Sequence, residues 1–187
     1  ADRIEGGHSP VSIERTFHRL EQLPVPTIAA VQGAALAGGC ELALHCDLRV
    51  AAEDARIGMT VARVGLLVPY DFIRKLIEVI GTPATAFLLF TSDTVDGPRA
   101  LAMGLVNEVV PEAEVEAAGR ALLEKISGNA PLSLRAMKAT LRRCMREAFL
   151  AEHKDLDEMV KVILKSSDAK EGARAFVEKR APVWKGE

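Results

Sequence analysis

A double glycine between two short apolar segments is the sequence feature that most constrains the fold of this chain. Residues 27–31 are apolar and partly β-branched, as in a buried parallel strand. After Gly38 and Gly39 the pattern becomes helical over residues 40–45, and residues 47–51 then alternate like a second strand. A strand, a glycine turn, a helix and a second strand in this order predict an α/β protein.

Helical patterns dominate the rest of the chain. Gly81 interrupts one of them, so a helix is expected on each side of this residue. Residues 105–110 are apolar and are expected to form a short strand. The helices are expected at residues 11–23, 71–80, 84–90, 99–103, 115–127, 131–149, 151–165 and 171–179.

The composition is that of an ordinary soluble globular protein. The 187 residues suit one domain, with 49% hydrophobic residues, 27% charged residues and a formal charge of -2. The 24 basic and 26 acidic residues form no long run of either sign, so we expect no binding to nucleic acid or to an anionic membrane. No apolar segment reaches the ~18 residues of a membrane span, and the chain start resembles neither a signal peptide nor a basic presequence.

The cysteines and histidines predict no metal site. Cys40, Cys46 and Cys144 lack metal-ligand spacing, and their odd number favours free thiols in a reducing compartment. The cytoplasm or an organelle matrix is expected, with the cytoplasm as the first choice. None of the four histidines has a spaced partner that would complete a metal site. His45 follows Glu41 by four residues on the predicted helix, where we expect a core or interface histidine.

The double glycine also predicts a site for a developing negative charge. Two glycines let the backbone approach a ligand closely, and the free N–H groups at a helix start carry a partial positive charge. We therefore expect the N–H of Gly38 to donate to an oxygen that becomes an oxyanion. The alternative is a tight strand-to-helix turn with no other role.

Glu41 lies one turn into the predicted helix, so its carboxylate can reach the same cleft as the Gly38 amide. A low dielectric there would raise the pKa of this carboxyl group and suit it to proton transfer. The alternative is an acidic residue near a helix N-terminus that is stabilised by the helix dipole.

Residues 24–49 read PVPTIAAVQGAALAGGCELALHCDLR and closely resemble the signature of the crotonase superfamily, the enoyl-CoA hydratase/isomerase family. Residues 96–110 and 175–180 are similar to two further segments of this family. The resemblance therefore extends from about residue 24 to residue 187.

The resemblance implies a crotonase-like (ClpP/crotonase) spiral of βα units with a C-terminal helical trimerisation region. Residues 1–125 would form a partial α/β core, and residues 126–187 would form the helical oligomerisation region. It also implies an acyl-CoA thioester as substrate, no cofactor beyond the coenzyme A moiety, and a role in fatty acid metabolism. The expected assembly is a homotrimer or a dimer of trimers.

Four further residues receive roles from the resemblance. In the family the glycine that corresponds to Gly38 provides one oxyanion donor, and an alanine of an upstream Gly-Ala-Asp motif provides the other. Ala1, which Asp2 follows, would be the remnant of that motif, and the family's first strands would then be missing from this chain. Phe176 and Lys179 match the family's Phe-x-Glu-Lys-Arg pattern, in which they reach the adenine and phosphates of CoA, often from a neighbouring subunit. The alternative for both is an ordinary solvated helix end.

The chain departs from the resembling hydratases at one position. Those hydratases use the glutamate that corresponds to Glu41 and a second glutamate twenty residues later, where this chain has Val61 after Thr60. Valine cannot transfer a proton, which weakens both a hydratase and an isomerase interpretation.

The residues around this departure resemble a different subfamily. Met59-Thr60 followed by Val68-Pro69-Tyr70 is similar to a pattern of methylmalonyl-CoA decarboxylases, with a spacing longer by two residues. The resemblance implies that Tyr70 positions a substrate carboxylate whose loss leaves an enolate. The alternative is a packing aromatic residue at the start of a helix.

These features predict an acyl-CoA-processing lyase that stabilises a thioester enolate in a backbone oxyanion hole. A decarboxylase-like reaction is the first hypothesis, and an atypical hydratase that keeps only Glu41 is the second. A thioester hydrolase and a non-catalytic acyl-CoA-binding subunit are the alternatives, since a fold can persist after its chemistry is lost.

Overall fold

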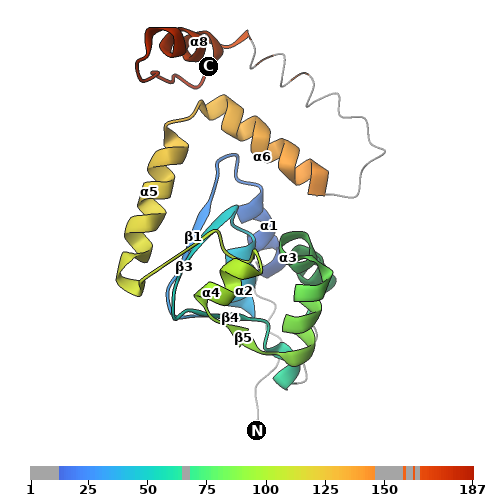
Figure 1. The fold of residues 1–187 in the computed structure, drawn as a ribbon. Coiled ribbons are helices and arrows are strands. Elements are labelled where there is room, and N and C mark those ends of the chain that lie inside the picture. The colour runs from blue at the N-terminus through green and yellow to red at the C-terminus, as the bar shows by residue number, and fades with distance from the viewer. Residues whose placement is uncertain (1–12, 65–67, 146–157, 159–161, 163–164) are drawn as a thin grey trace. The chain divides into compact units, whose positions relative to one another are not determined.

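The computed structural model of the protein describes residues 13–64, 68–145, 158, 162 and 165–187. The chain divides into two compact units, whose elements can be followed by colour in Figure 1. The first unit contains residues 1–23 and 29–115, and the second contains residues 24–28 and 116–187. The division at residue 125 into a core and an oligomerisation region stays a prediction.

One small sheet is built from the apolar segments that flank the double glycine. Its strands are β1 (Ile28–Val31), β3 (Leu48–Ala52) and β6 (Glu108–Val110), in the order β1-β3-β6. β3 and β6 are parallel, with Val50 opposite Glu108 and Ala52 opposite Val110. Val50, Ala51 and Ala52 are fully buried, as expected for a central strand that is covered on both faces.

A second small sheet lies next to the glycine turn. Its strands are β2 (Ala34–Leu36), β4 (Arg56–Gly58) and β5 (Thr94–Val95), with β2 parallel and β5 antiparallel to β4. The sequence pattern predicts none of these strands, because each has only two or three residues and β4 pairs with distant segments. A Cβ atom on Gly58 would lie 2.7 Å from the carbonyl oxygen of Asp93, so only glycine permits this close pairing.

Helices surround these strands in the first unit. They are α1 (Ile13–Glu21), α2 (Gly38–Leu44), η1 (Val61–Val64), α3 (Tyr70–Thr91), α4 (Gly97–Ala102) and η2 (Glu112–Glu114). α3 is broken at Gly81, where φ is 72°, so two helices meet there as the sequence predicts. α4 begins where Asp96 accepts a hydrogen bond from the Arg99 N–H at 2.8 Å, a side-chain N-cap.

The second unit is helical. It contains α5 (Val115–Ser127), α6 (Pro131–Met145) and α8 (Ser167–Glu178). The predicted helix at 131–149 extends beyond the described residues, and most of the one predicted at 151–165 lies outside them. α8 starts four residues before its predicted start at 171, because the Ser166 hydroxyl accepts a hydrogen bond from the Ala169 N–H at 3.0 Å and caps it.

The C-terminal tail packs back onto the helices of its own unit. The indole N–H of Trp184 donates to the carbonyl oxygen of Gly128 at 2.7 Å, at the end of α5. A Cβ atom on Gly172 would lie 3.2 Å from the Trp184 ring, so the indole also lies against α8. Within the described residues of either unit, no helix is long and apolar enough to cross a membrane.

Candidate active site

The turn into α2 has an unusual backbone conformation. Ala37 has φ 47° and ψ -113°, values that a residue with a Cβ atom rarely adopts, and its N–H donates to the carbonyl oxygen of Gly58 at 2.9 Å. Gly38 follows as the first residue of α2, in the turn whose N–H groups have no acceptor within the helix. Cβ atoms added to Gly38 and Gly39 would meet no atom within 4 Å. This backbone therefore borders open space that a ligand can approach.

Glu41 lies one turn further along α2, and its carboxyl group is buried. Its side chain is 1% exposed, and neither carboxylate oxygen has a hydrogen-bond partner among the described residues. Burial raises the pKa of Glu41 to about 8, although the positive charge of Lys75 opposes the shift. A carboxyl group with this pKa is mostly protonated at neutral pH and can both release and accept a proton there.

His45 lies beside Glu41 in an aromatic cluster. Its ring centroid lies 5.2 Å from that of Phe17 on α1 and 6.0 Å from that of Phe72 on α3. The His45 Nδ1 is 2.8 Å from the main-chain oxygen of Glu41 but 3.9 Å from the nearer carboxylate oxygen. Burial lowers the pKa of His45, which favours the neutral ring. The predicted role as a core histidine therefore fits its surroundings, where it joins α2 to two neighbouring helices.

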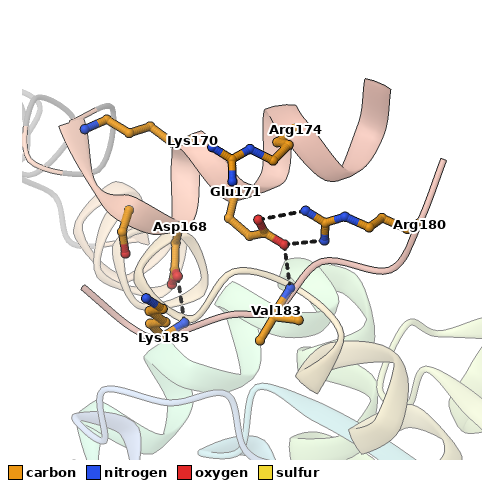
Figure 2. A pocket seen from close by; sticks show the side chains of 8 residues that line it. Asp168, Lys170, Glu171, Arg174, Arg180, Val183 and Lys185 are labelled. Carbon is orange, nitrogen blue, oxygen red and sulfur yellow. Dashed lines mark hydrogen bonds and ion pairs between the residues drawn. The ribbon is translucent and has the colours of Figure 1, made fainter. Parts of the chain in front are cut away.

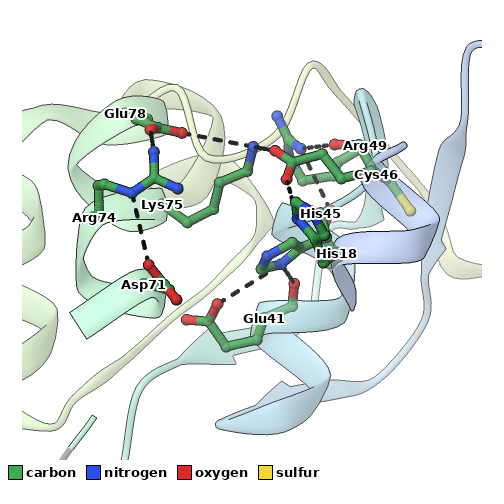
Figure 3. Close-up of polar contacts among 11 residues, drawn as sticks. His18, Glu41, His45, Cys46, Arg49, Asp71, Arg74, Lys75 and Glu78 are labelled. Carbon is green, nitrogen blue, oxygen red and sulfur yellow. Dashed lines mark hydrogen bonds and ion pairs between the residues drawn. The ribbon is translucent and has the colours of Figure 1, made fainter. Parts of the chain in front are cut away.

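Lys75 is a site residue that the sequence pattern does not reveal. Figure 3 shows its side chain on α3, where it contacts Glu78 of the same helix. Its Nζ lies 2.5 Å from Glu21 of α1 and 3.7 Å from Glu78 of α3. Burial raises the pKa of Glu41 by more than the positive charge of Lys75 lowers it. A lysine within an ordinary helical pattern gives no indication of this contact between α1 and α3.

The structure shows no contact between Glu41 and the other predicted site residues that it describes in the first unit. Val61 begins η1 at the position of the second family glutamate and is partly buried. Tyr70 is the first residue of α3 and is 73% exposed, and within the described chain no hydrogen bond holds its hydroxyl group. The structure therefore shows no contact that joins Tyr70 to Glu41. Ala1 lies outside the described residues.

The two residues predicted to bind CoA belong to the second unit. Phe176 is part of α8, and Lys179 follows directly after that helix. Lys179 is exposed and has a left-handed backbone with φ 53°. The role of both residues in CoA binding stays a prediction.

Known proteins match nearly the whole chain. The family model described as Enoyl-CoA hydratase/isomerase matches residues 6–187. The short-chain-enoyl-CoA hydratase of Clostridium acetobutylicum is 34% identical over 95% of this chain and 68% of that protein. An enoyl-CoA hydratase structure from Bacillus anthracis has a TM-score of 0.83 at 35% identity and covers 94% of this chain and 68% of that chain.

A further solved structure shows how much of a related protein this chain covers. An enoyl-CoA hydratase/carnithine racemase from Magnetospirillum magneticum superimposes with a TM-score of 0.88 at 30% identity, over 93% of this chain and 64% of that chain. This chain thus spans about two thirds of the length of the proteins that it matches.

Proposed function

The chain belongs to the enoyl-CoA hydratase/isomerase family, and we propose that it adds water reversibly across the double bond of an enoyl-CoA thioester. The α/β class and the crotonase fold expected from the sequence are confirmed by the family match and the structural neighbours. Within the proposal, Gly38 donates its N–H to the thioester oxygen, and Glu41 transfers the protons.

The observation that carries this proposal is the buried carboxyl group of Glu41, for which the described residues supply no hydrogen bond. An unpaired polar group in a protein interior is destabilising, so its presence needs an explanation beyond folding. Glu41 lies one helical turn after Gly38, on the helix whose start borders open space. This arrangement supports proton transfer next to an oxygen that becomes negatively charged.

One carboxyl group is enough to balance the reaction. The ionised Glu41 accepts a proton from water while the water oxygen bonds to the β-carbon of the substrate. The electrons of the double bond move onto the thioester oxygen, which the N–H of Gly38 stabilises as an oxyanion. Glu41 then returns the proton to the α-carbon as the carbonyl group re-forms. The second family glutamate, replaced here by Val61, is not needed for this balance.

Decarboxylation of a malonyl-type thioester is the second candidate. Val61 in place of the second glutamate favours this reaction, because loss of carbon dioxide forms the enolate without the help of a base. Tyr70 is 73% exposed, and no hydrogen bond within the described chain orients its hydroxyl group for the positioning role that this reaction requires. Hydration requires a group that moves a proton from water to the α-carbon, as the buried carboxyl group of Glu41 can, whereas loss of carbon dioxide itself needs no base.

Further expectations about binding, assembly and location accompany this function. We propose that Phe176 and Lys179 contact the adenine and phosphates of CoA, and that no cofactor beyond the coenzyme A moiety takes part. We also propose that the upstream alanine donor corresponds to Ala1. Assembly as a homotrimer or a dimer of trimers in the cytoplasm completes the proposal.

Product analysis tests the reaction directly. The purified protein and its Glu41→Gln variant are incubated with crotonyl-CoA and, separately, with methylmalonyl-CoA. We expect the protein to convert crotonyl-CoA to the hydroxyacyl-CoA and the variant to lose this activity. Hydration at an unchanged rate by Glu41→Gln would contradict the proposal. Carbon dioxide release that survives in the variant would identify a decarboxylase, free CoA thiol would identify a hydrolase, and CoA binding without turnover would identify a binding subunit.

A further inference from the structure

The C-terminal end of α8 contains a lysine in a position that favours glycine. The Arg180 N–H donates to the carbonyl oxygen of Ala175 at 3.1 Å, which closes a Schellman-type turn. The residue inside this turn is Lys179, with φ 53°. For a residue with a Cβ atom this left-handed conformation has an energetic cost, which contacts of the surrounding residues can offset.

Glu171 contacts the chain on the far side of this turn. Its two carboxylate oxygens accept hydrogen bonds from the two terminal nitrogens of Arg180, at 2.6 and 3.0 Å (Figure 2). One of these oxygens also accepts a hydrogen bond from the Val183 N–H at 3.0 Å. These hydrogen bonds lower the pKa of Glu171 to about 2, so the pair remains charged at neutral pH. A carboxylate inside α8 is thereby joined to the chain on the far side of Lys179.

Lys179 itself is left available. It is exposed, and within the described part of the chain no ion pair holds its ammonium group. Its neighbours differ in this respect, because Glu178 accepts a hydrogen bond from the Arg180 Nε at 2.5 Å. The turn thus fixes the backbone on both sides of a lysine whose side chain remains free for an anion.

We propose that Glu171 is a positioning residue for the nucleotide part of CoA. Through Arg180 it holds the left-handed turn that directs the ammonium group of Lys179 toward a phosphate of the bound CoA. This inference rests on the proposed function, in which Lys179 contacts the CoA phosphates. Without the pair between Glu171 and Arg180, the backbone of Lys179 would relax toward a conformation that L-residues prefer. The side chain of Lys179 would then point in a different direction.

A substitution at Glu171 separates positioning from general stability. Glutamine offers one acceptor oxygen where the carboxylate offers two, and its amide group faces the guanidinium group with donors. In the purified full chain, we expect Glu171→Gln to raise the KM for crotonyl-CoA about tenfold, the effect of one lost charge-assisted contact, with kcat little changed. The KM for crotonyl-pantetheine, which lacks the nucleotide, should stay unchanged.

A matched control and a double mutant complete the design. Glu178→Gln removes the other carboxylate partner of Arg180 but leaves the pair with Glu171, so its KM should change less than about twofold. Lys179→Met keeps the turn but removes the ammonium group, and Glu171→Gln should add nothing to the KM in this background. An equal further increase in the double mutant, or an equal increase with crotonyl-pantetheine, would overturn the inference.

Calorimetric titration with free CoA distinguishes this inference from the proposed function. A protein that binds CoA but gives the same dissociation constant after Glu171→Gln would refute the positioning role and leave the proposed function intact. A protein that does not bind CoA would overturn both. If Glu171→Gln weakens CoA binding about tenfold, the positioning role is supported. If the protein in that case also fails to hydrate crotonyl-CoA, only the proposed hydratase reaction is contradicted.

Discussion

Two glutamates of this protein show how differently the same side chain can be used. Glu41 on α2 is 1% exposed and has no hydrogen-bond partner among the described residues, and burial raises its pKa to about 8. Glu171 on α8 accepts hydrogen bonds from Arg180 and Val183, which lower its pKa to about 2. Each shift follows from the immediate surroundings, by desolvation in the first case and by hydrogen bonding in the second.

This difference in pKa distinguishes Glu41, which can exchange a proton, from Glu171, which stabilises the local structure. A carboxylate with several donors remains charged at all ordinary pH values and stabilises the fold around it. A buried carboxyl group without donors destabilises the fold when it ionises, but it can exchange a proton at neutral pH. The same substitution is therefore expected to have different effects at the two residues, and the variants below test this contrast.

The largest effect is expected from Glu41→Gln. Loss of a proton-transferring group should lower kcat for hydration about 1,000-fold. The exposed Glu53 at the end of β3 provides a matched control, since Glu53→Gln removes a carboxylate of the same unit and should leave kcat within about twofold. Steady-state hydration of crotonyl-CoA by the three proteins measures this. A similar loss in both variants would point to general electrostatics rather than proton transfer.

The next effect concerns the oxyanion donor. Gly38→Pro removes the N–H, and kcat should fall about 100-fold or more. Gly38→Ala keeps the N–H, and its added Cβ atom would meet no protein atom within 4 Å, so this variant should lose less activity than Gly38→Pro. Thermal unfolding of both variants verifies that the fold is intact. Equal activity of the proline and alanine variants would remove the Gly38 amide from the mechanism.

Stability should depend on pH in opposite directions at the two glutamates. Unfolded Glu41 ionises near 4.5 whereas folded Glu41 ionises near 8, so its contribution to folding is lost as pH rises through this window. Glu41→Gln should therefore increase the free energy of unfolding at pH 8 by roughly 3 kcal/mol. The contribution of Glu171 is present above its ordinary pKa and is lost as pH falls toward 2. Urea titrations from pH 3 to pH 8 measure both, and parallel pH profiles of the two glutamine variants would refute the contrast.

The smallest effect is expected at Tyr70. Its ring is 73% exposed at the start of α3, so Tyr70→Phe should change the hydration rate by less than about twofold. The same variant tests the decarboxylase hypothesis, because loss of a carboxylate-positioning hydroxyl group would lower that activity. Carbon dioxide release from methylmalonyl-CoA that disappears in Tyr70→Phe would favour decarboxylation over hydration.

The sequence predicts the parts of the fold that local patterns determine. The strand before Gly33, the helix after Gly38 and the interruption at Gly81 all follow from apolar periodicity and glycine placement. β2, β4 and β5 are not predicted, since their existence depends on long-range pairing such as the close approach of Gly58 to Asp93. Short strands of this kind carry too few residues for a period to be visible.

The candidate site shows the same division. Glu41 and Gly38 are identified from the sequence because the helix places them one turn apart, and the family pattern surrounds them. The contact of Lys75 with Glu21 and the pairing of Glu171 with Arg180 arise only when separate segments meet in space. Periodicity within one helix cannot reveal a partner that another segment supplies.

The position of Trp184 has a spectroscopic consequence. The chain contains a single tryptophan, and its indole is bound to Gly128 and lies against Gly172 within the helical second unit. Its fluorescence emission therefore reports on that unit alone, whereas far-ultraviolet circular dichroism reports on helices of both. Comparing the two optical probes during denaturation reveals whether the two parts of the molecule melt together or one after the other.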